Sequence, residues 1–249
     1  MIHTALAALR RVGLEVSRTR PNLIDFLQSR SIDCVLDVGA NVGQFGRWLR
    51  NRGYTGRIIS FEPISEVYQL LVQEVRGDVL WETKNLAIGD RCGPATINIG
   101  SNSALSSFLS ASEVVPSDRV HSFKDRNETV AVTTLDEIGA EISGNVFLKS
   151  DTQGFERQVL EGAKTLLSRL RGVQLELPIV HAYRGTWTLP QAIEYMHENG
   201  FVISQIHPVA FCTNLLPDKA SLLPDKASLW EVDAIFRRLD PAIDLGLRK

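Results

Sequence analysis

The 249-residue sequence has little cysteine, almost no net charge and no long hydrophobic run. Its three cysteines, Cys34, Cys92 and Cys212, show no CxxC or metal-ligand spacing, so we expect reduced thiols of a cytoplasmic protein rather than a disulfide or metal framework. The formal net charge is −2 and no Lys/Arg-rich run occurs, which argues against nucleic-acid binding. No apolar stretch approaches the ~18 residues that can cross a bilayer.

A chain of this length can bury one large core, and its 44% hydrophobic and 22% charged residues are typical of a soluble enzyme. We expect an N-terminal helical extension over residues 1–30 and a single domain over residues 31–249. Residues 1–20 place apolar side chains at helical spacing before their arginines, whereas a secretory signal has the charges first. This segment is predicted to pack on the domain as a helix or, alternatively, to contact an anionic membrane surface peripherally.

Strand-like and helix-like segments alternate along the chain, which predicts a mostly parallel, doubly wound α/β sheet. The clearest helix is predicted to have one apolar face running from Val159 to Leu170. The strand-like runs are at residues 34–36, 57–62, 81–88, 129–133, 146–151, 173–177, 201–206 and 229–237.

Two other segments stand out. Residues 101–128 are polar and rich in serine, and so long a loop in a compact domain is typical of a lid or substrate loop. The sequence Leu-Leu-Pro-Asp-Lys-Ala-Ser at residues 215–221 is repeated without change at residues 222–228. We interpret the repeat as a duplicated loop segment, because lengthening a loop costs little closure entropy.

The most informative segment is Asp-Val-Gly-Ala-Asn-Val-Gly at residues 37–43. An acid and two glycines stand there where a buried strand should turn into a helix. A second acid, Glu62, closes the next strand-like run. A strand, a glycine loop, a helix and an acid at the next strand end are typical of a nucleoside-binding corner of an α/β sheet.

The kind of nucleoside follows from the charge of the loop. A dinucleotide site would show G-x-G-x-x-G, but the first glycine position carries Asp37, whose carboxylate would repel a phosphate. S-adenosylmethionine fits better, because it has no phosphate, a cationic sulfonium and an ammonium group, and its ribose hydroxyls suit Glu62. The alternatives are ordinary turn glycines with surface acids, and a nicotinamide-dependent oxidoreductase.

Four segments in order resemble the FkbM family of class I S-adenosylmethionine-dependent methyltransferases: residues 37–43, Phe-Glu-Pro at 61–63, Asn-Leu-Ala-Ile-Gly at 85–89, and Leu-Lys-Ser-Asp-Thr-Gln-Gly-Phe-Glu at 148–156. Residues 232–236 are similar to the closing strand of that family. The resemblance implies a Rossmann-like, seven-stranded, mostly parallel sheet with an antiparallel last strand. The predicted cofactor-binding residues are Asp37, Gly39, Asn41, Gly43, Glu62, Asn85 and Ala87.

The resemblance also implies O-methylation of a sugar or polyketide hydroxyl. The sequence of residues 151–156, together with the serine-rich segment at 103–107, resembles that of an actinobacterial branch of the family that methylates sugars of glycolipids. We therefore expect a small-molecule or lipid-linked sugar as the acceptor, no nucleic acid, and a cytoplasmic location that includes the inner membrane face. A polyketide or lipid hydroxyl, and a catalytically silent binding subunit, are the alternatives. Ser150 departs from the family pattern and puts a polar group near the site.

A hydroxyl is a weak nucleophile, so methyl transfer to it benefits from a base. Asp151, at the end of a predicted strand, is the first candidate for that base, although an acid there could instead cap the next helix. Glu156 is interpreted as such a structural acid. His181 is the second candidate base, because imidazole titrates near neutral pH.

The acceptor is predicted to contact Glu176, Tyr183 and Ser107. Asp151 and Glu176 could share a divalent cation, but no second acid adjoins either residue, so no metal is predicted. The oligomeric state is not predicted.

Overall fold

The computed structural model describes residues 22–115, 122, 124–211 and 228–240. The predictions for residues 1–20, for Cys212 and for nearly all of the tandem repeat therefore lie outside the described residues. No helix of the described part is long and apolar enough to cross a membrane. Cys34 is a buried free thiol and Cys92 an exposed one.

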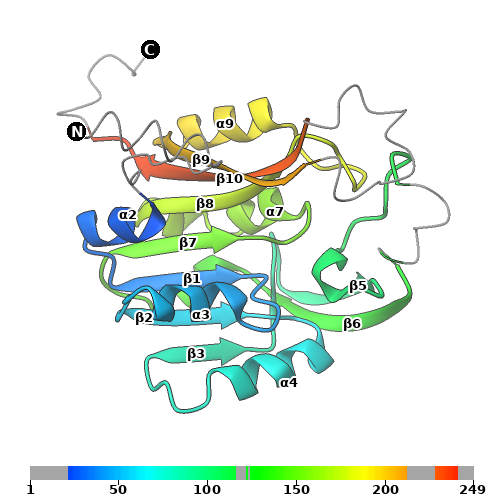
Figure 1. Ribbon diagram of the computed structural model, residues 1–249, viewed down its shortest axis with the longest axis horizontal. Coiled ribbons are helices and arrows are strands. Elements are labelled where there is room, and N and C mark those ends of the chain that lie inside the picture. The colour runs from blue at the N-terminus through cyan, green and yellow to red at the C-terminus, as the bar shows by residue number, and fades with distance from the viewer. Residues whose placement is uncertain (1–21, 116–121, 123, 212–227, 241–249) are drawn as a thin grey trace, which may run out of the picture.

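Seven strands form one twisted sheet in the order β3-β2-β1-β7-β8-β10-β9 (Figure 1). Neighbours from β3 to β8 are parallel, and β10, the last strand among the described residues, runs antiparallel to both β8 and β9. The predicted fold class is confirmed. The strands are β1 (Cys34–Val38), β2 (Arg57–Phe61), β3 (Trp81–Lys84), β7 (Val146–Ser150), β8 (Leu170–Pro178), β9 (Phe201–Phe211) and β10 (Leu229–Arg238).

Helices cover both faces of the sheet, because the central strands are apolar on both sides. Val35 and Phe147 share a core cluster with α2 and α3, whereas Leu36 and Leu148 pack with α7, α8 and α9 on the opposite face. The helices are α2 (Leu23–Ser29), α3 (Gln44–Asn51), α4 (Ser65–Glu74), α6 (Leu135–Gly139), α7 (Glu156–Glu161), α8 (Lys164–Leu167) and α9 (Leu189–Glu198).

The described end of the predicted N-terminal extension is part of the domain core. Asn22 caps α2 through a capping box, and Phe26 meets Phe147 edge to face with ring centroids 5.7 Å apart. Helix α2 is therefore fixed against β7.

A second, three-stranded sheet was not predicted. It consists of β4 (Ala87–Ile88), β6 (Arg126–Thr133) and β5 (Gly93–Ile99), in that order. The prediction of one strand over residues 81–88 is wrong because the chain leaves the large sheet at Asn85, whose amide donates to the carbonyl oxygens of Glu62 and Pro63. The polar segment 101–128 contains a short 3₁₀ helix, η1 (Ser103–Leu105), and the start of β6.

The single helix predicted from Val159 to Leu170 is also wrong. Helix α7 ends at Glu161 with Gly162 as its C-cap, α8 follows, and Leu170 already begins β8. Gly162 packs so closely on another loop that a Cβ there would lie 1.9 Å from the carbonyl oxygen of Gly89. The apolar residues still share one face because both short helices pack on the same core.

Candidate functional site

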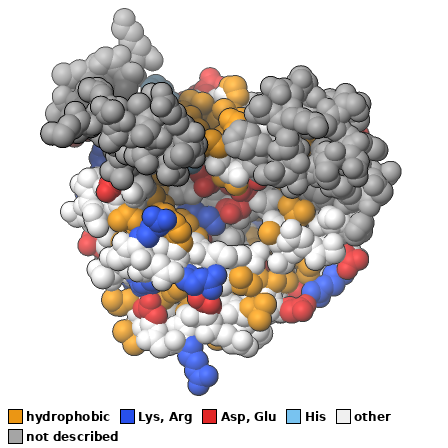
Figure 2. Space-filling model, viewed as in Figure 1, with side chains coloured by type: hydrophobic (Ala, Val, Ile, Leu, Met, Phe, Trp, Pro, Cys, Tyr) orange, Lys and Arg blue, Asp and Glu red, His pale blue; other side chains and the backbone are white. Residues whose placement is uncertain are grey.

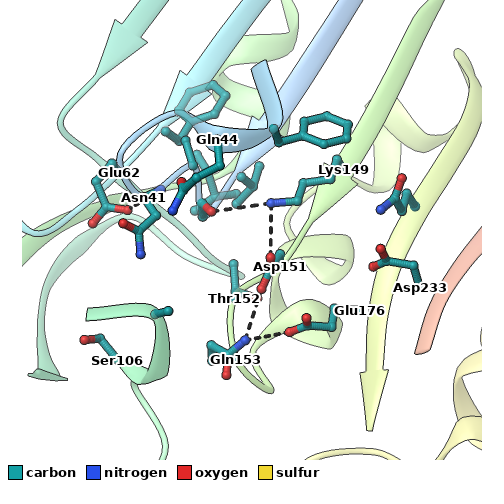
Figure 3. A pocket seen from close by; sticks show the side chains of 18 of the residues that line it. Asn41, Gln44, Glu62, Ser106, Lys149, Asp151, Thr152, Gln153, Glu176 and Asp233 are labelled. Atoms are coloured by element: carbon teal, nitrogen blue, oxygen red, sulfur yellow. Dashed lines mark hydrogen bonds and ion pairs between the residues drawn. The ribbon is translucent and has the colours of Figure 1, made fainter. Parts of the chain in front are cut away.

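A cavity of about 810 Å³ lies at the carboxyl ends of the parallel strands, where ligands bind in open α/β sheets. Its walls come from the loop after β1, the end of β2, the segment around β4, residues 103–108, and the ends of β7 and β8 (Figure 3). The predicted site residues that line it are Gly39, Asn41, Glu62, Ala87, Asp151 and Glu176. Asp37, Gly43, Asn85, Ser107, His181 and Tyr183 are not among the lining residues.

Glu62 holds the loop after β1 in place. Its two carboxylate oxygens accept hydrogen bonds from the backbone N–H groups of Asn41 and Ile64, both at 2.9 Å. Burial raises the pKa of Glu62 to about 7, although the two N–H donors favour the charged form. Asn41 has a positive φ of 50°, and its Nδ2 lies 3.4 Å from Ser103 Oγ across the cavity. The corner thus presents one carboxylate to a ligand.

Two predicted cofactor residues support this corner from behind. The amide of Asn85 holds the backbone of residues 62–63, as described above. Gly43 has φ +87° at the N-cap of α3, and a Cβ there would touch Leu71 at 3.0 Å. Ala87 lines the cavity from β4, next to Leu86 and Ile88.

Asp37 lies beneath the cavity and is fully buried. Its Oδ2 accepts from Ser60 Oγ at 3.0 Å, and its Oδ1 is 3.4 Å from Lys149 Nζ. Burial raises the pKa of Asp37, while Lys149 and Ser60 favour its ionised form. A direct contact between Asp37 and a ligand therefore requires the loop to open, and its present contact with the cavity runs through Lys149.

A chain of polar side chains crosses the cavity floor from β7 to β8 (Figure 3). Lys149 Nζ lies 3.3 Å from Asp151 Oδ2, and Gln153 Nε2 donates to Asp151 Oδ1 at 3.1 Å and to Glu176 Oε2 at 2.5 Å. One amide group therefore joins two carboxyl groups. Unlike Asp37, Asp151 has 34% of its side chain exposed, so a ligand can reach it.

The two carboxyl groups on this chain are held in different protonation states. Burial opposes the ionisation of Asp151, but the Lys149 ammonium and hydrogen bonds from Glu176 and Gln153 keep its pKa below the usual value. Burial and the charges of Asp151 and Glu231 raise the pKa of Glu176 well above its usual range. The protonated form is therefore favoured for Glu176 and the ionised form for Asp151.

The two other predicted acceptor residues converge on Gln153. Ser107 Oγ donates to the carbonyl oxygen of Gln153 at 2.7 Å, and Tyr183 Oη lies 3.1 Å from Gln153 Oε1 and 2.8 Å from the carbonyl oxygen of Leu105. Both side chains are buried, so they position Gln153 and the segment after β5.

Three further predicted residues lie away from the cavity surface. The His181 Nδ1 is 2.9 Å from Thr186 Oγ1, in the loop after β8. Ser150 is fully buried and does not line the cavity, so the expected polar group near the site is absent from the described lining, because alternate residues of β7 face opposite sides. Glu156 is a structural acid, but it does not cap the helix as predicted and instead accepts from the N–H groups of Thr152 and Gly154 in the loop before α7.

Gly39 allows the loop after β1 to lie against the loop after β7. Its φ is +77°, and a Cβ would lie 1.9 Å from the carbonyl oxygen of Asp151. We expect Gly39→Ala to lower the free energy of unfolding by more than the about 1–3 kcal/mol that a positive φ alone costs. Gly185→Ala is the matched control, with φ +79° and no atom within 4 Å. Equal losses for the two variants in urea unfolding would contradict this account of Gly39.

A carboxylate in place of Gln153 should break the pairing of Asp151 with Glu176. Gln153→Glu removes both donated hydrogen bonds and adds a third carboxyl group, so we expect a loss of about 1–3 kcal/mol in unfolding free energy at pH 8. Because the added acid has a raised pKa in the folded state, the folded state binds more protons and the loss should shrink towards pH 5. Gln73→Glu, on the exposed face of α4, is the control and should show neither effect. A pH-independent loss would contradict the charge argument.

Two residues of the site, Lys149 and Gln153, have no role in the prediction from sequence. The signal for Lys149 was a cation inside an otherwise apolar strand-like run. Gln174 and Asp233, which also line the cavity, carried a weaker signal, namely polar residues at alternate positions of two strands. Gln153 had no local signal, because its partners are distant in the sequence. Among the described residues, no three His, Cys, Asp or Glu side chains are grouped to hold a metal ion.

Comparison with known proteins identifies one family. Residues 37–203 match the family described as "Methyltransferase FkbM domain". No curated protein matches the chain. A magnesium protoporphyrin IX methyltransferase from Synechocystis, solved with bound SAM, aligns with a TM-score of 0.43 and 11% identity over 94% of this chain and 91% of its own. An rRNA methylase from Streptococcus thermophilus aligns with a TM-score of 0.46 and 10% identity over 90% of this chain and 100% of its own.

Proposed function

Because the chain belongs to the FkbM methyltransferase family and its cofactor is S-adenosylmethionine, we propose that it methylates a hydroxyl group of a sugar, carried by a glycolipid or a secondary metabolite. The observation that carries the proposal is Asp151, an ionised and ligand-accessible carboxylate on the cavity floor. The acceptor atom is proposed to be oxygen because a proton acceptor of this kind serves a hydroxyl nucleophile.

The residues of the cavity fit the cofactor. Glu62 offers two carboxylate oxygens at the end of β2 for the ribose hydroxyls, and Ala87 and Ile64 offer apolar surface for the base. When bound, the cofactor supplies an electrophilic methyl group, so the protein has mainly to position the acceptor and exclude water.

Asp151 is proposed to accept the proton of the acceptor hydroxyl. The alternative role for this residue, as a cap of the next helix, is not seen: α7 has no side-chain cap, and the N–H groups of Thr152 and Gly154 in the loop before it are held by Glu156. Asp151 instead contacts Lys149 and Gln153, and its carboxylate stays partly exposed to the cavity beside both. A positioned base of this type contributes on the order of 10²–10⁴ in rate.

Glu176 and Gln153 are proposed to orient the acceptor beside Asp151. The raised pKa of Glu176 favours its protonated form, whose proton is donated to Asp151, so Glu176 is left to accept a hydrogen bond from a sugar hydroxyl. The Lys149 ammonium, shared between Asp37 and Asp151, favours the ionised form of the base. Tyr183 and Ser107 act indirectly, through the position of Gln153.

The test is a comparison of glycolipids and small glycosides from the source organism with and without the gene. We expect the deletion strain to accumulate a species lighter by one methylene on a sugar, and the intact gene to restore the methylated form. If the missing methyl group were on a polyketide or acyl chain, the result would favour the alternative acceptor over the sugar. No missing methyl group, together with no thermal stabilisation by S-adenosylhomocysteine, would indicate a silent binding subunit and refute the proposal. A cofactor at 100 times its Kd should stabilise the fold by about 2.7 kcal/mol.

A further inference from the structure

Strands β8 and β10 carry a row of polar side chains over the cavity that the proposed chemistry does not fully use. Asp233 lies opposite Glu176 in the antiparallel register, and Glu231 precedes it by two residues on the same face. Gln174 is two residues before Glu176. We call Gln174, Glu176, Glu231 and Asp233 the β8–β10 wall. All four line the cavity, and acidic side chains gather in the hollow at the centre of this face (Figure 2).

Gln174 gives independent evidence that the wall is built for a ligand. Its side chain is buried, with 6% exposed, and its amide contacts the carboxylate of Asp233 and favours its charged form. Since Asp233 accepts, the amide nitrogen faces it, and Gln174 Oε1 has no hydrogen-bond partner among the described residues. A buried acceptor without a donor is unfavourable, so a ligand that donates there is favoured.

The acidic side chains around the wall disfavour one another's ionised forms, so a cation bound there would be stabilising. Burial, Asp151, Glu231 and Glu156 raise the pKa of Glu176. Burial, Asp151, Asp233 and Glu156 raise the pKa of Glu231 to about 7. The pKa of Asp233 is raised by burial and Asp151 and is lowered by Gln174, Lys149 and His207. Tyr183, the remaining titratable side chain facing Glu176, is neutral because burial raises its pKa.

Lys149 cannot neutralise the wall, because its ammonium already lies between Asp37 and Asp151. His207, on β9, faces only Asp233 in the register. Burial and mutual repulsion therefore raise the pKa of each carboxyl group of the wall. A ligand with a positive charge would let them ionise and would gain several charge-assisted hydrogen bonds.

The cofactor does not supply that charge at this place. Four strand spacings separate β2, which carries Glu62, from β10, roughly 19 Å at about 4.8 Å each. About eight covalent bonds join a ribose hydroxyl oxygen of S-adenosylmethionine to its ammonium nitrogen, about 10 Å at the extended-chain length of ~3.8 Å per three bonds. With the ribose at Glu62, the ammonium extends about two strand spacings, as far as β7, and does not reach Asp233 on β10.

We propose that the β8–β10 wall binds a protonated amine of the acceptor, so that the substrate is an amino sugar whose ammonium lies between Asp233, Glu231 and Gln174 Oε1. This inference rests on the proposed function and narrows its substrate class. The ammonium donates to the three acceptors, and each carboxyl group that ionises releases its proton to the solvent.

The test is isothermal titration of the full-length protein, saturated with S-adenosylhomocysteine, with glucosamine, N-acetylglucosamine and glucose. We expect glucosamine to bind at least tenfold more tightly than the two neutral sugars. Titration at pH 7 in two buffers of different ionisation enthalpy should show net proton release for glucosamine alone. Asp233→Asn should remove both the preference and the proton release and leave S-adenosylhomocysteine binding unchanged. Glu198→Gln, exposed on α9, is the control and should change nothing.

The outcomes separate this inference from the proposed function. No binding of S-adenosylhomocysteine would refute the function, whereas normal binding without a preference for glucosamine would refute only the amine site. Weaker binding of S-adenosylhomocysteine to Asp233→Asn would assign the wall to the cofactor and would also overturn the inference. Circular dichroism of each variant confirms that the fold is retained.

Discussion

Asp151→Asn should lower methyl transfer by about 10²–10⁴-fold and leave the binding of S-adenosylhomocysteine nearly unchanged. Asparagine has the same shape and can still accept the hydrogen bond from Gln153, but it cannot take a proton from the acceptor hydroxyl. Lys149 keeps its second partner, Asp37, so the floor of the cavity should stay in place. The measurement is restoration of the methylated product in the deletion strain, quantified by mass spectrometry.

The control for this experiment is Asp90→Asn, which removes an exposed carboxylate outside the cavity and should restore the product as the unchanged gene does. Full restoration by Asp151→Asn would show that this residue is not the base. His181 would then be the remaining candidate from the sequence, although it contacts Thr186 and does not line the cavity.

The fold was predictable from sequence where burial dictates the residue type. Strands β1, β2 and β7 are buried on both faces, so they appear as short apolar runs that end at an acid or a glycine. The small sheet was not predictable in the same way. Strand β4 has two residues and β5 has only two buried ones, so neither gives a hydrophobic period.

Helix α7 shows a different limit of the sequence pattern. A period of 3.6 residues records which side chains reach the core but does not record whether the backbone stays helical between them. The break at Gly162 depends on the approach of Gly89, a contact between loops 73 residues apart that no local pattern contains.

The site, too, was predictable in part from the sequence. The carboxyl ends of parallel strands meet at one edge, so Glu62, Asp151 and Glu176 could be grouped without a structure, and all three line the cavity. Which acid stays ionised could not be predicted, because it depends on Lys149 and Gln153 lying within 3.3 Å and 3.1 Å of Asp151. Asp37 has the most conspicuous position in the sequence, yet its carboxylate is buried beneath the site.

Glu62→Gln should weaken the binding of S-adenosylhomocysteine by about 10²–10⁴-fold, since two hydrogen bonds to a charged carboxylate are worth roughly 3–6 kcal/mol together. The pKa of about 7 adds a pH dependence. Ribose hydroxyls donate to the ionised form, so the affinity of the unchanged protein should rise about tenfold from pH 6 to pH 8 and then level off. Glu62→Gln should abolish that rise, because its amide does not titrate in this range.

Titration calorimetry at several pH values measures both effects. Glu66→Gln, which changes an exposed glutamate of α4, should keep the affinity and the rise with pH. The amide of Glu62→Gln leaves one of the N–H groups of Asn41 and Ile64 unpaired, so urea unfolding must show that the variant is folded under the binding conditions. A folded variant that binds as tightly as the unchanged protein would place the ribose away from Glu62. The ammonium of the cofactor could then lie closer to β10, which would weaken the inference of a separate amine site on the β8–β10 wall.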